Sequence, residues 1–339
     1  MRSLVFLFTI FITLSTATGA EEPFFKPNDV VALVGGEDMV VAAELGYLET
    51  LIQLALPDHH LKFRSLAREG DTVFEQRRDL NYPKLEDQLD KIGATVVICQ
   101  FGQMESLAAM DSVDKTDKVD RANAPAKASA ESAVHEVHEV HSVQEKAEAT
   151  RKAKAGEFVA GYGKLIARLK GKDGARRIVV VQKLTATDGS ENSTKAAHAS
   201  NIFPQALVAL QPIPGVTLLD YSSLPEPSGR RSVAESIRFG SHSDFAEAAR
   251  SLANNTKGKW QDYTVKEDLR ALITAKNRLW YYYYRPQNWA FLAGDRTNQP
   301  SSRDHLDPSK RWFPEELEKF VPLIDAKDAE IWALAKKLQ

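Results

Sequence analysis

The sequence predicts an α/β protein in which a five-stranded parallel sheet lies between two layers of helices. The first observation is a set of five short apolar runs rich in β-branched residues, at residues 30–34, 61–66, 95–101, 177–182 and 216–221. Most of these runs are continuously apolar and do not alternate. This favours strands buried on both faces, as in a parallel sheet.

The second observation is that helical patterns separate the apolar runs. They occupy residues 42–56, 84–92, 158–169, 202–210 and 246–254. Strands that alternate with helices in this way are typical of a doubly wound sheet with right-handed crossovers, which gives a three-layer α/β/α fold. Ligands of such sheets bind beyond the carboxyl ends of the strands, so we expect the chemistry there.

Composition and charge restrict the class of protein. The chain has 339 residues, of which 43% are hydrophobic, enough for one large core or two modest ones. Its 44 Lys and Arg nearly balance its 46 Asp and Glu. Because this balance leaves no basic footprint, we expect no nucleic-acid partner. The single cysteine, Cys99, lies within an apolar run and is interpreted as a buried structural thiol.

The first 20 residues have the pattern of a secretory signal peptide. Arg2 supplies a positive charge, residues 4–14 are almost wholly apolar, and small residues precede Glu21. We expect cleavage after Ala20, a secreted or periplasmic protein, and no integral membrane span after cleavage. The alternative is an uncleaved anchor, for which the apolar run is short, because a spanning helix needs about 20 residues.

Two further parts follow the signal, and the first contains an insertion. Residues 28–254 carry the strand and helix pattern, interrupted at 107–155 by a low-complexity insertion that is interpreted as disordered or as a solvated helix. A His-Glu-Val repeat at 135–141 places histidines on one helical face, so it is either a metal site or a charged spacer. Residues 262–339 are predicted to form a helical C-terminal extension that packs on the core, with helices at 269–284 and 315–338.

Glycines and charged residues gather where the predicted strands end. The first three runs are followed by Gly35-Gly36-Glu37, by Glu69-Gly70-Asp71 and by Gly102-Gln103-Met104-Glu105. The fifth run is followed by Glu235 and Arg238. A glycine at each turn lets the backbone bend and a ligand approach closely. These turns are therefore the candidate site.

This ordered set resembles the SGNH/GDSL hydrolase family, over residues 28–254 without the insertion. Segments 46–50, 69–74 and 285–289 resemble a secreted branch of planctomycete type. The resemblance implies a flavodoxin-like α/β/α fold and hydrolysis of acyl or carbohydrate esters without a cofactor. In that family a serine after the first strand is the nucleophile, a glycine and an asparagine stabilise the oxyanion, and a late Asp-x-x-His supplies acid and base.

Carried over to this chain, the family's serine falls on Glu37 and its asparagine on Met104, while Gly70 keeps the glycine. The late acid falls on Glu235 and the base on Arg238, which stays protonated near neutral pH. His242 lies one helical turn further on and is the residue that could replace the base. Since ester hydrolysis needs nucleophile, base and oxyanion donors together, the resemblance implies that ordinary serine-esterase turnover is lost.

Carboxylates remain at the predicted site in place of the triad. Crowded carboxylates raise one another's pKa, and they can act as acid and base or bind a hard cation. The alternative is an ion-paired, solvated rim. The carboxylates expected near the sheet edge are Glu37, Asp38, Asp71, Glu105 and Glu235, with Arg68 and Arg238 among them. Two functions stay open: an ester hydrolase, or a degenerate member that binds a small-molecule or carbohydrate ligand without hydrolysing it.

The C-terminal extension contains a dense aromatic and charged motif at residues 285–296. One interpretation is a lid that brings Trp289, Asp295, Arg296, Arg303 and His305 to the cleft. The other is an arm that wraps the core and fills it with the tyrosines of 281–284, Trp289 and Phe291.

Overall fold

The computed structural model describes residues 24–102, 104–105, 133–181, 202–219 and 266–338. Five parallel strands form one sheet in the order β2-β1-β3-β4-β5. They are β1 (Val30–Gly35), β2 (Lys62–Ser65), β3 (Val96–Gln100), β4 (Arg177–Val181) and β5 (Val216–Leu219). This is the flavodoxin-like strand order, in which the chain reverses direction across the sheet between β1 and β3. The predicted fold class is confirmed.

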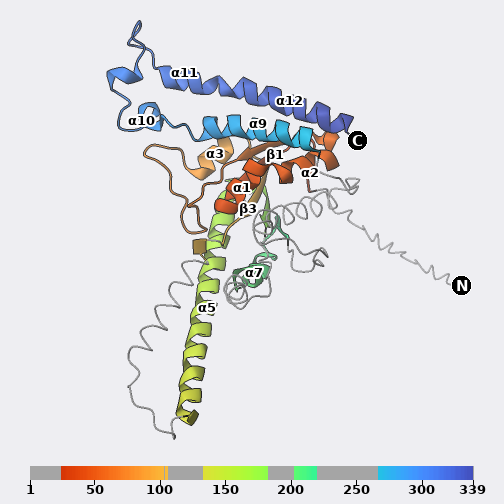
Figure 1. The fold of residues 1–339 in the computed structure, drawn as a ribbon, viewed down its shortest axis with the longest axis vertical. Coiled ribbons are helices and arrows are strands. Elements are labelled where there is room, and N and C mark those ends of the chain that lie inside the picture. Colours follow the sequence, from red (N-terminus) through yellow and green to blue (C-terminus); the bar gives the residue numbers. More distant parts are fainter. Residues whose placement is uncertain (1–23, 103, 106–132, 182–201, 220–265, 339) are drawn as a thin grey trace, which may run out of the picture.

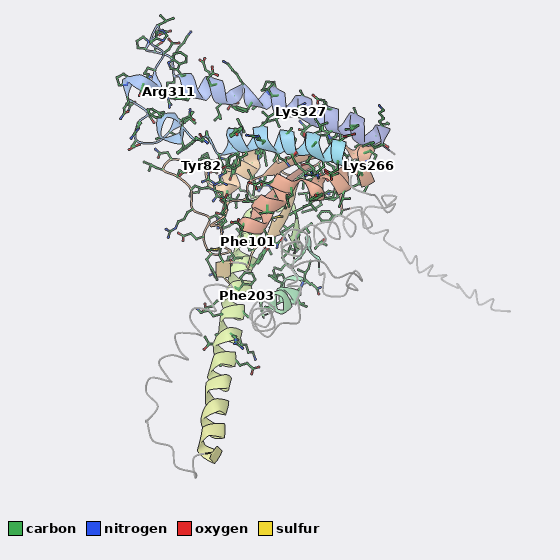
Figure 2. The ribbon with its side chains drawn as sticks, in the orientation of Figure 1. Tyr82, Phe101, Phe203, Lys266, Arg311 and Lys327 are labelled. Carbon is green, nitrogen blue, oxygen red and sulfur yellow. The ribbon has the colours of Figure 1, made fainter. Side chains whose placement is uncertain are left out.

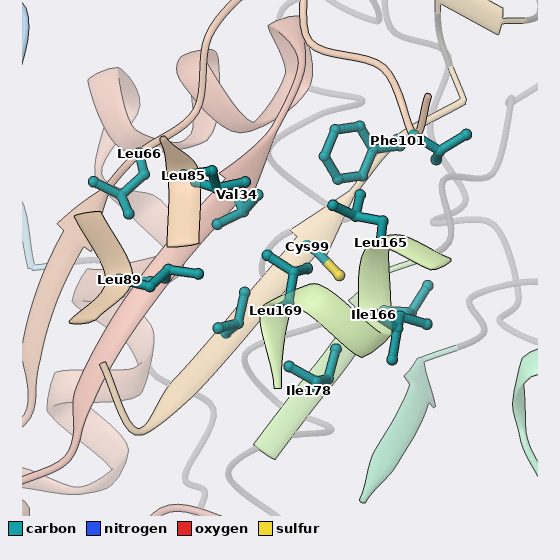
Figure 3. Packing of buried hydrophobic residues seen from close by; sticks show 14 of the residues in the cluster. Val34, Leu66, Leu85, Leu89, Cys99, Phe101, Leu165, Ile166, Leu169 and Ile178 are labelled. Carbon is teal, nitrogen blue, oxygen red and sulfur yellow. The ribbon is translucent and has the colours of Figure 1, made fainter. Parts of the chain in front are cut away.

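Helices cover both faces of the sheet. On one face, α1 (Glu37–Leu45) and α2 (Tyr47–Ala55) bury Met39 and Ile52 against Val31 and Leu33 of β1. On the other face, α3 (Leu85–Lys91), α5 (Ala133–Leu169) and α7 (Ile202–Leu207) cover the alternate residues of the same strands. Figure 3 shows this second cluster, with Cys99 next to side chains of α5.

Cys99 is buried and free, as the sequence predicts. Its Sγ lies 3.3 Å from the carbonyl oxygen of Val179. Burial raises the pKa of the thiol to about 12, so the reactive thiolate is disfavoured.

Two predicted helices are divided in the structure. The predicted helix at 42–56 is α1 and α2, and α1 starts earlier, at Glu37. Gly46 separates them because its backbone is left-handed, with φ of 71°, and ends α1. The predicted helix at 315–338 is α11 (Trp312–Glu318) followed by α12 (Phe320–Lys337).

Helix α5 is longer than the predicted helix at 158–169. It starts at Ala133, so residues 133–155 of the predicted insertion are helical. Its N-terminal part projects away from the sheet (Figure 1). Residues 107–132 of the insertion lie outside the described residues, and so does the predicted helix at 246–254.

The C-terminal extension consists of α9 (Glu267–Tyr284), α10 (Trp289–Leu292), α11 and α12, together with a short 3-10 turn η3 (Pro300–Ser302). Two further 3-10 turns, η1 (Pro57–His59) and η2 (Val208–Leu210), belong to the core. Helix α9 packs on α1, α2 and β2, and α12 packs along α9 (Figure 1). No helix in the described ranges combines the length and apolar character that a bilayer crossing requires.

Side chains of α9 bind the outer carbonyl groups of the edge strand β2. The Lys276 amine and the Trp280 indole N–H donate to the carbonyl oxygens of Phe63 and Ser65, at 3.3 and 2.6 Å. The Tyr284 hydroxyl donates at 3.1 Å to that of Leu66, just beyond the strand. Four residues of helix rise about 6 Å, close to the roughly 6.6 Å of two strand residues. The helix can therefore follow the strand and cover an edge that would otherwise be open to pairing.

A buried charge cluster lies beneath this contact. Glu49 of α2, Arg64 of β2, Lys276 of α9 and Asp328 of α12 are each no more than 6% exposed. The Lys276 amine lies 2.5 Å from Glu49 Oε1, and Arg64 Nη2 lies 2.5 Å from Asp328 Oδ2. Two cations and two anions from four elements thus balance, and they join both long helices of the extension to the core.

Candidate functional site

The turn after β1 places Glu37 at the first position of α1. Gly35 is tightly packed, since a Cβ added there would lie 2.3 Å from the carbonyl oxygen of Gln100. Glu37 is exposed, and the neighbouring Asp38 accepts a hydrogen bond from Gln100 Nε2 at 3.1 Å. Carboxylates in the first turn also interact favourably with the helix dipole. The position of Glu37 therefore favours the start of α1 electrostatically.

The turn after β2 contains a buried ion pair. Arg78 Nη1 and Nη2 bind the two oxygens of Asp71 at 2.7 and 2.9 Å, in the bidentate geometry that suits guanidinium and carboxylate. Both side chains are at most 5% exposed. Burial nevertheless raises the pKa of Asp71, and Arg78 opposes that effect. Gly70, which precedes Asp71, is exposed.

Glu105 connects the turn after β3 to the turn after β2. Its Oε1 accepts the backbone N–H of Val73 at 2.7 Å, and its Oε2 accepts that of Gly102 at 3.0 Å. Gly102 has φ of 122°, a region that favours glycine. Burial raises the pKa of the Glu105 carboxyl, and the hydrogen bonds from Val73 and Gly102 oppose this.

A cavity of about 10 Å³ lies between these turns. That volume is near the minimum for one water molecule. Three of the predicted carboxylates, Asp38, Asp71 and Glu105, line it together with Gln100 and Met104. Within the described ranges, however, no three His, Cys, Asp or Glu residues are spaced to hold a metal ion.

The structure thus brings together part of the predicted site. Asp38, Asp71 and Glu105 share the cavity, whereas Glu37 and Gly70 are exposed near it. Glu235, Arg238 and His242 lie outside the described residues. The catalytic roles assigned to Glu37, Gly70, Glu105, Glu235, Arg238 and His242 therefore stay predictions.

The C-terminal extension holds the loop that follows β2. The Arg68 guanidinium carbon lies 4.6 Å from the ring centre of Tyr82 and 5.7 Å from that of Tyr284. The Tyr82 hydroxyl donates to the carbonyl oxygen of Tyr284, and Trp289 Nε1 donates to that of Leu80 at 2.8 Å. Figure 2 places Tyr82 near the end of α9. These contacts agree with the arm interpretation only in part, because Tyr284 is buried whereas Tyr281 is 39% exposed.

Three other residues of the lid interpretation contact other parts of the extension. The Arg296 guanidinium carbon lies 5.7 Å from the ring centre of Phe291, and His305 stacks on Trp312 with ring centres 5.9 Å apart. Arg303 pairs with Arg311 in an isolated β-bridge. None of the residues described as lining the small cavity comes from the extension.

Sequence reasoning missed two hollows along α9. A groove of about 1030 Å³ lies between α1, the end of β2 and α9. A smaller hollow of about 230 Å³ lies between the end of α9 and α11. Tyr282 lines both, so the run of four tyrosines at 281–284 is the signal in the sequence that marks this surface.

Glu105→Gln tests the contact between the two turns. In the folded protein the pKa of Glu105 is raised above its usual value of 4.5. Protonation of Glu105 therefore stabilises the fold below pH 4.5, and this stabilisation is lost as pH rises through the folded-state pKa. The difference in unfolding free energy between wild type and variant is therefore expected to narrow with rising pH. Urea unfolding across pH about 4 to 8 measures it. A difference independent of pH would contradict the assignment.

Comparisons with known proteins give only distant likenesses. No family model and no curated protein matches the chain. A solved structure of a gut microbial diltiazem-metabolizing enzyme, BT4096, aligns with 59% of this chain at 13% identity and a TM-score of 0.35, and the match spans 39% of that enzyme. The lipase Lip_vut3 from a goat rumen metagenome aligns with 66% of this chain at 15% identity and a TM-score of 0.40, over 97% of the lipase. The α/β class rests on strand order and layers, not on these likenesses.

Proposed function

We propose that this chain is an exported protein with an SGNH-hydrolase-like fold that binds a small-molecule or carbohydrate ligand and does not hydrolyse esters through a serine nucleophile. The observation that carries the proposal is the turn after β1. An exposed carboxylate, Glu37, stands there in place of a hydroxyl, beside a cavity of only about 10 Å³. A carboxylate at that place has no hydroxyl group that an adjacent base could activate as a serine nucleophile.

Ester hydrolysis is the second candidate, and one observation favours it. Gly70 is exposed in the turn after β2, so its backbone remains accessible at the position where the family places an oxyanion donor. Turnover would also need a base, for which His242 is the candidate in the sequence.

Release of p-nitrophenol from p-nitrophenyl acetate, and of acetate from acetylated xylan, tests the proposal. The purified protein is expected to match Glu37→Ala, His242→Ala and the control Glu318→Ala, an exposed carboxylate of α11, at the background rate. Glu37→Ser is expected to add no turnover, because Arg238 at the base position cannot accept the serine proton. Turnover above background that is lost in Glu37→Ala or His242→Ala, but kept in Glu318→Ala, would establish hydrolysis instead.

A further inference from the structure

The groove on α9 has the size and walls of a ligand site. Its volume of about 1030 Å³ is at the upper end of the usual range for ligand pockets. Val40 and Glu44 of α1 form one wall, and Thr274, Arg278 and Tyr281 are on the α9 side. Tyr281 is 39% exposed, so a large part of its side chain is free to meet a ligand.

The smaller hollow shares one lining residue with the groove. Tyr282 lines both depressions, and its ring centre lies 6.4 Å from that of Phe320 at the start of α12. Gln287 and Asn288, which also line the hollow, supply amide donors and acceptors. Tyr282 therefore lies between the aromatic wall of the groove and the amides of the hollow.

The charges along the surface are mixed in sign. The groove carries Glu44 and Arg278 without a predominance of either charge. Arg285 at its end is already paired with Glu69 at 2.9 Å, and Glu316 of the hollow with Lys319 at 2.5 Å. A nucleic acid would need a basic stripe, which these charges do not form. Balanced charges with neutral amides and hydroxyls suit a neutral polyhydroxylated ligand better.

The tyrosines supply the apolar part of such recognition. A sugar ring presents a face of C–H groups to an aromatic ring and hydroxyl groups at its edge. Tyr281 and Tyr282 have ring centres 5.9 Å apart. The Arg278 Nε donates to the Tyr282 hydroxyl at 3.2 Å, and the Arg285 guanidinium carbon lies 5.1 Å from the Tyr281 ring centre. The Arg278 guanidinium carbon also lies 5.8 Å from the Tyr282 ring centre. Each ring thus has an arginine over one face, which restricts its motion and lowers the entropy cost of stacking a ligand on the other face.

We propose that the groove and the hollow form one binding surface for a neutral carbohydrate chain, with Tyr281 and Tyr282 as its stacking platforms. This inference rests on the proposed ligand-binding function and places the ligand on α9 instead of at the carboxyl edge of the sheet. The volumes agree with that choice, since the hollows of about 1030 and 230 Å³ are far larger than the cavity of about 10 Å³ at that edge.

Calorimetric titration with soluble fragments of xylan, cellulose and chitin tests the inference. At least one fragment is expected to bind, and Tyr281→Ala and Tyr282→Ala are each expected to weaken that binding about tenfold. Tyr282→Phe keeps the ring and is expected to retain most of the affinity. Phe74→Ala removes an aromatic residue that is 56% exposed in the loop after β2, and is expected to leave the affinity unchanged. Thermal unfolding of each variant shows that it is folded.

The outcomes separate this inference from the proposed function. Carbohydrate binding that is insensitive to both tyrosine substitutions, or is lost in Phe74→Ala, overturns the site on α9 and leaves ligand binding in place. Binding of laurate vesicles or an RNA oligonucleotide, but of no glycan fragment, overturns the carbohydrate class. If no glycan fragment binds, the inference is overturned as well. The proposed lack of serine hydrolysis is tested separately, by the ester assays.

Discussion

Replacing Lys276 with methionine is expected to lower the free energy of unfolding by about 3–5 kcal/mol. Methionine keeps the length of the side chain but removes its charge, which leaves Glu49 without its closest cation in a site where both side chains are at most 2% exposed. The second oxygen of Glu49 has no hydrogen-bond partner even in the wild type, so nothing in the described structure replaces the amine. Urea unfolding followed by far-ultraviolet circular dichroism measures the change.

An exposed lysine provides the matched control. Lys327 of α12 pairs with Glu330 at 2.6 Å, with the two side chains 31% and 51% exposed. Lys327→Met is therefore expected to change the unfolding free energy by only about 0.5 kcal/mol. If the two variants lost similar stability, the buried charge cluster would have no special role.

A double variant shows whether uncompensated charge is the cause. In Lys276→Met the cluster keeps Glu49, Asp328 and Arg64, so it carries one excess negative charge. Adding Glu49→Gln removes that excess and leaves the Arg64–Asp328 pair at 2.5 Å. The double variant is therefore expected to lose less stability than the sum of the two single losses, by about 1–3 kcal/mol. Additive losses would indicate that packing rather than charge determines the cost.

The sheet could be predicted from the sequence because each strand has its own local pattern of apolar residues. A strand buried on both faces requires a short apolar run, and each run is bounded by a change of pattern. The break at Gly46 was missed because apolar residues continue on both sides of it. The break depends on tertiary packing, since a side chain at residue 46 would lie 3.1 Å from Thr274 and 3.2 Å from Ile273.

For the carboxylates at the sheet edge, the sequence predicts their approximate location but not their hydrogen-bond partners. Strand ends predicted that Asp71 and Glu105 would lie near each other, and both line the same cavity. Their partners could not be predicted, because Glu105 accepts the N–H of Val73, 32 residues away, and Asp71 binds an arginine that the motif does not include. A carboxylate that is satisfied by backbone groups and one in a catalytic pair look the same in sequence.

The buried charge cluster left a faint signal in the sequence. Glu49 lies in α2, where eight of the nine residues are buried, and a lone acidic residue on such a helix requires a partner. The partner could not be identified, because Lys276 follows it by 227 residues and resembles any lysine of an amphipathic helix. Contacts of this separation are set by how α9 lies on the edge strand.

Trp280 provides the second test of how α9 covers that edge. Trp280→Ala is expected to lower the unfolding free energy by about 3–5 kcal/mol, because it removes a large side chain that is 6% exposed and packs in the second core cluster. Trp280→Phe keeps most of that packing but removes the N–H that donates to the carbonyl oxygen of Ser65 at 2.6 Å. Its expected cost is about 1–3 kcal/mol, the range for a polar group left without its partner. Urea unfolding measures both.

Trp289→Phe is the matched control, because Trp289 donates a similar bond of 2.8 Å to Leu80 at an exposed position, where water can replace it. Its cost is expected to be well below that of Trp280→Phe. The loss of Trp280 also uncovers carbonyl groups of an edge strand, which can then pair with another chain. Size-exclusion chromatography of Trp280→Ala is therefore expected to show concentration-dependent association that Trp289→Phe lacks. A monomeric Trp280→Ala protein with near wild-type stability would mean that α9 does not protect the edge of the sheet.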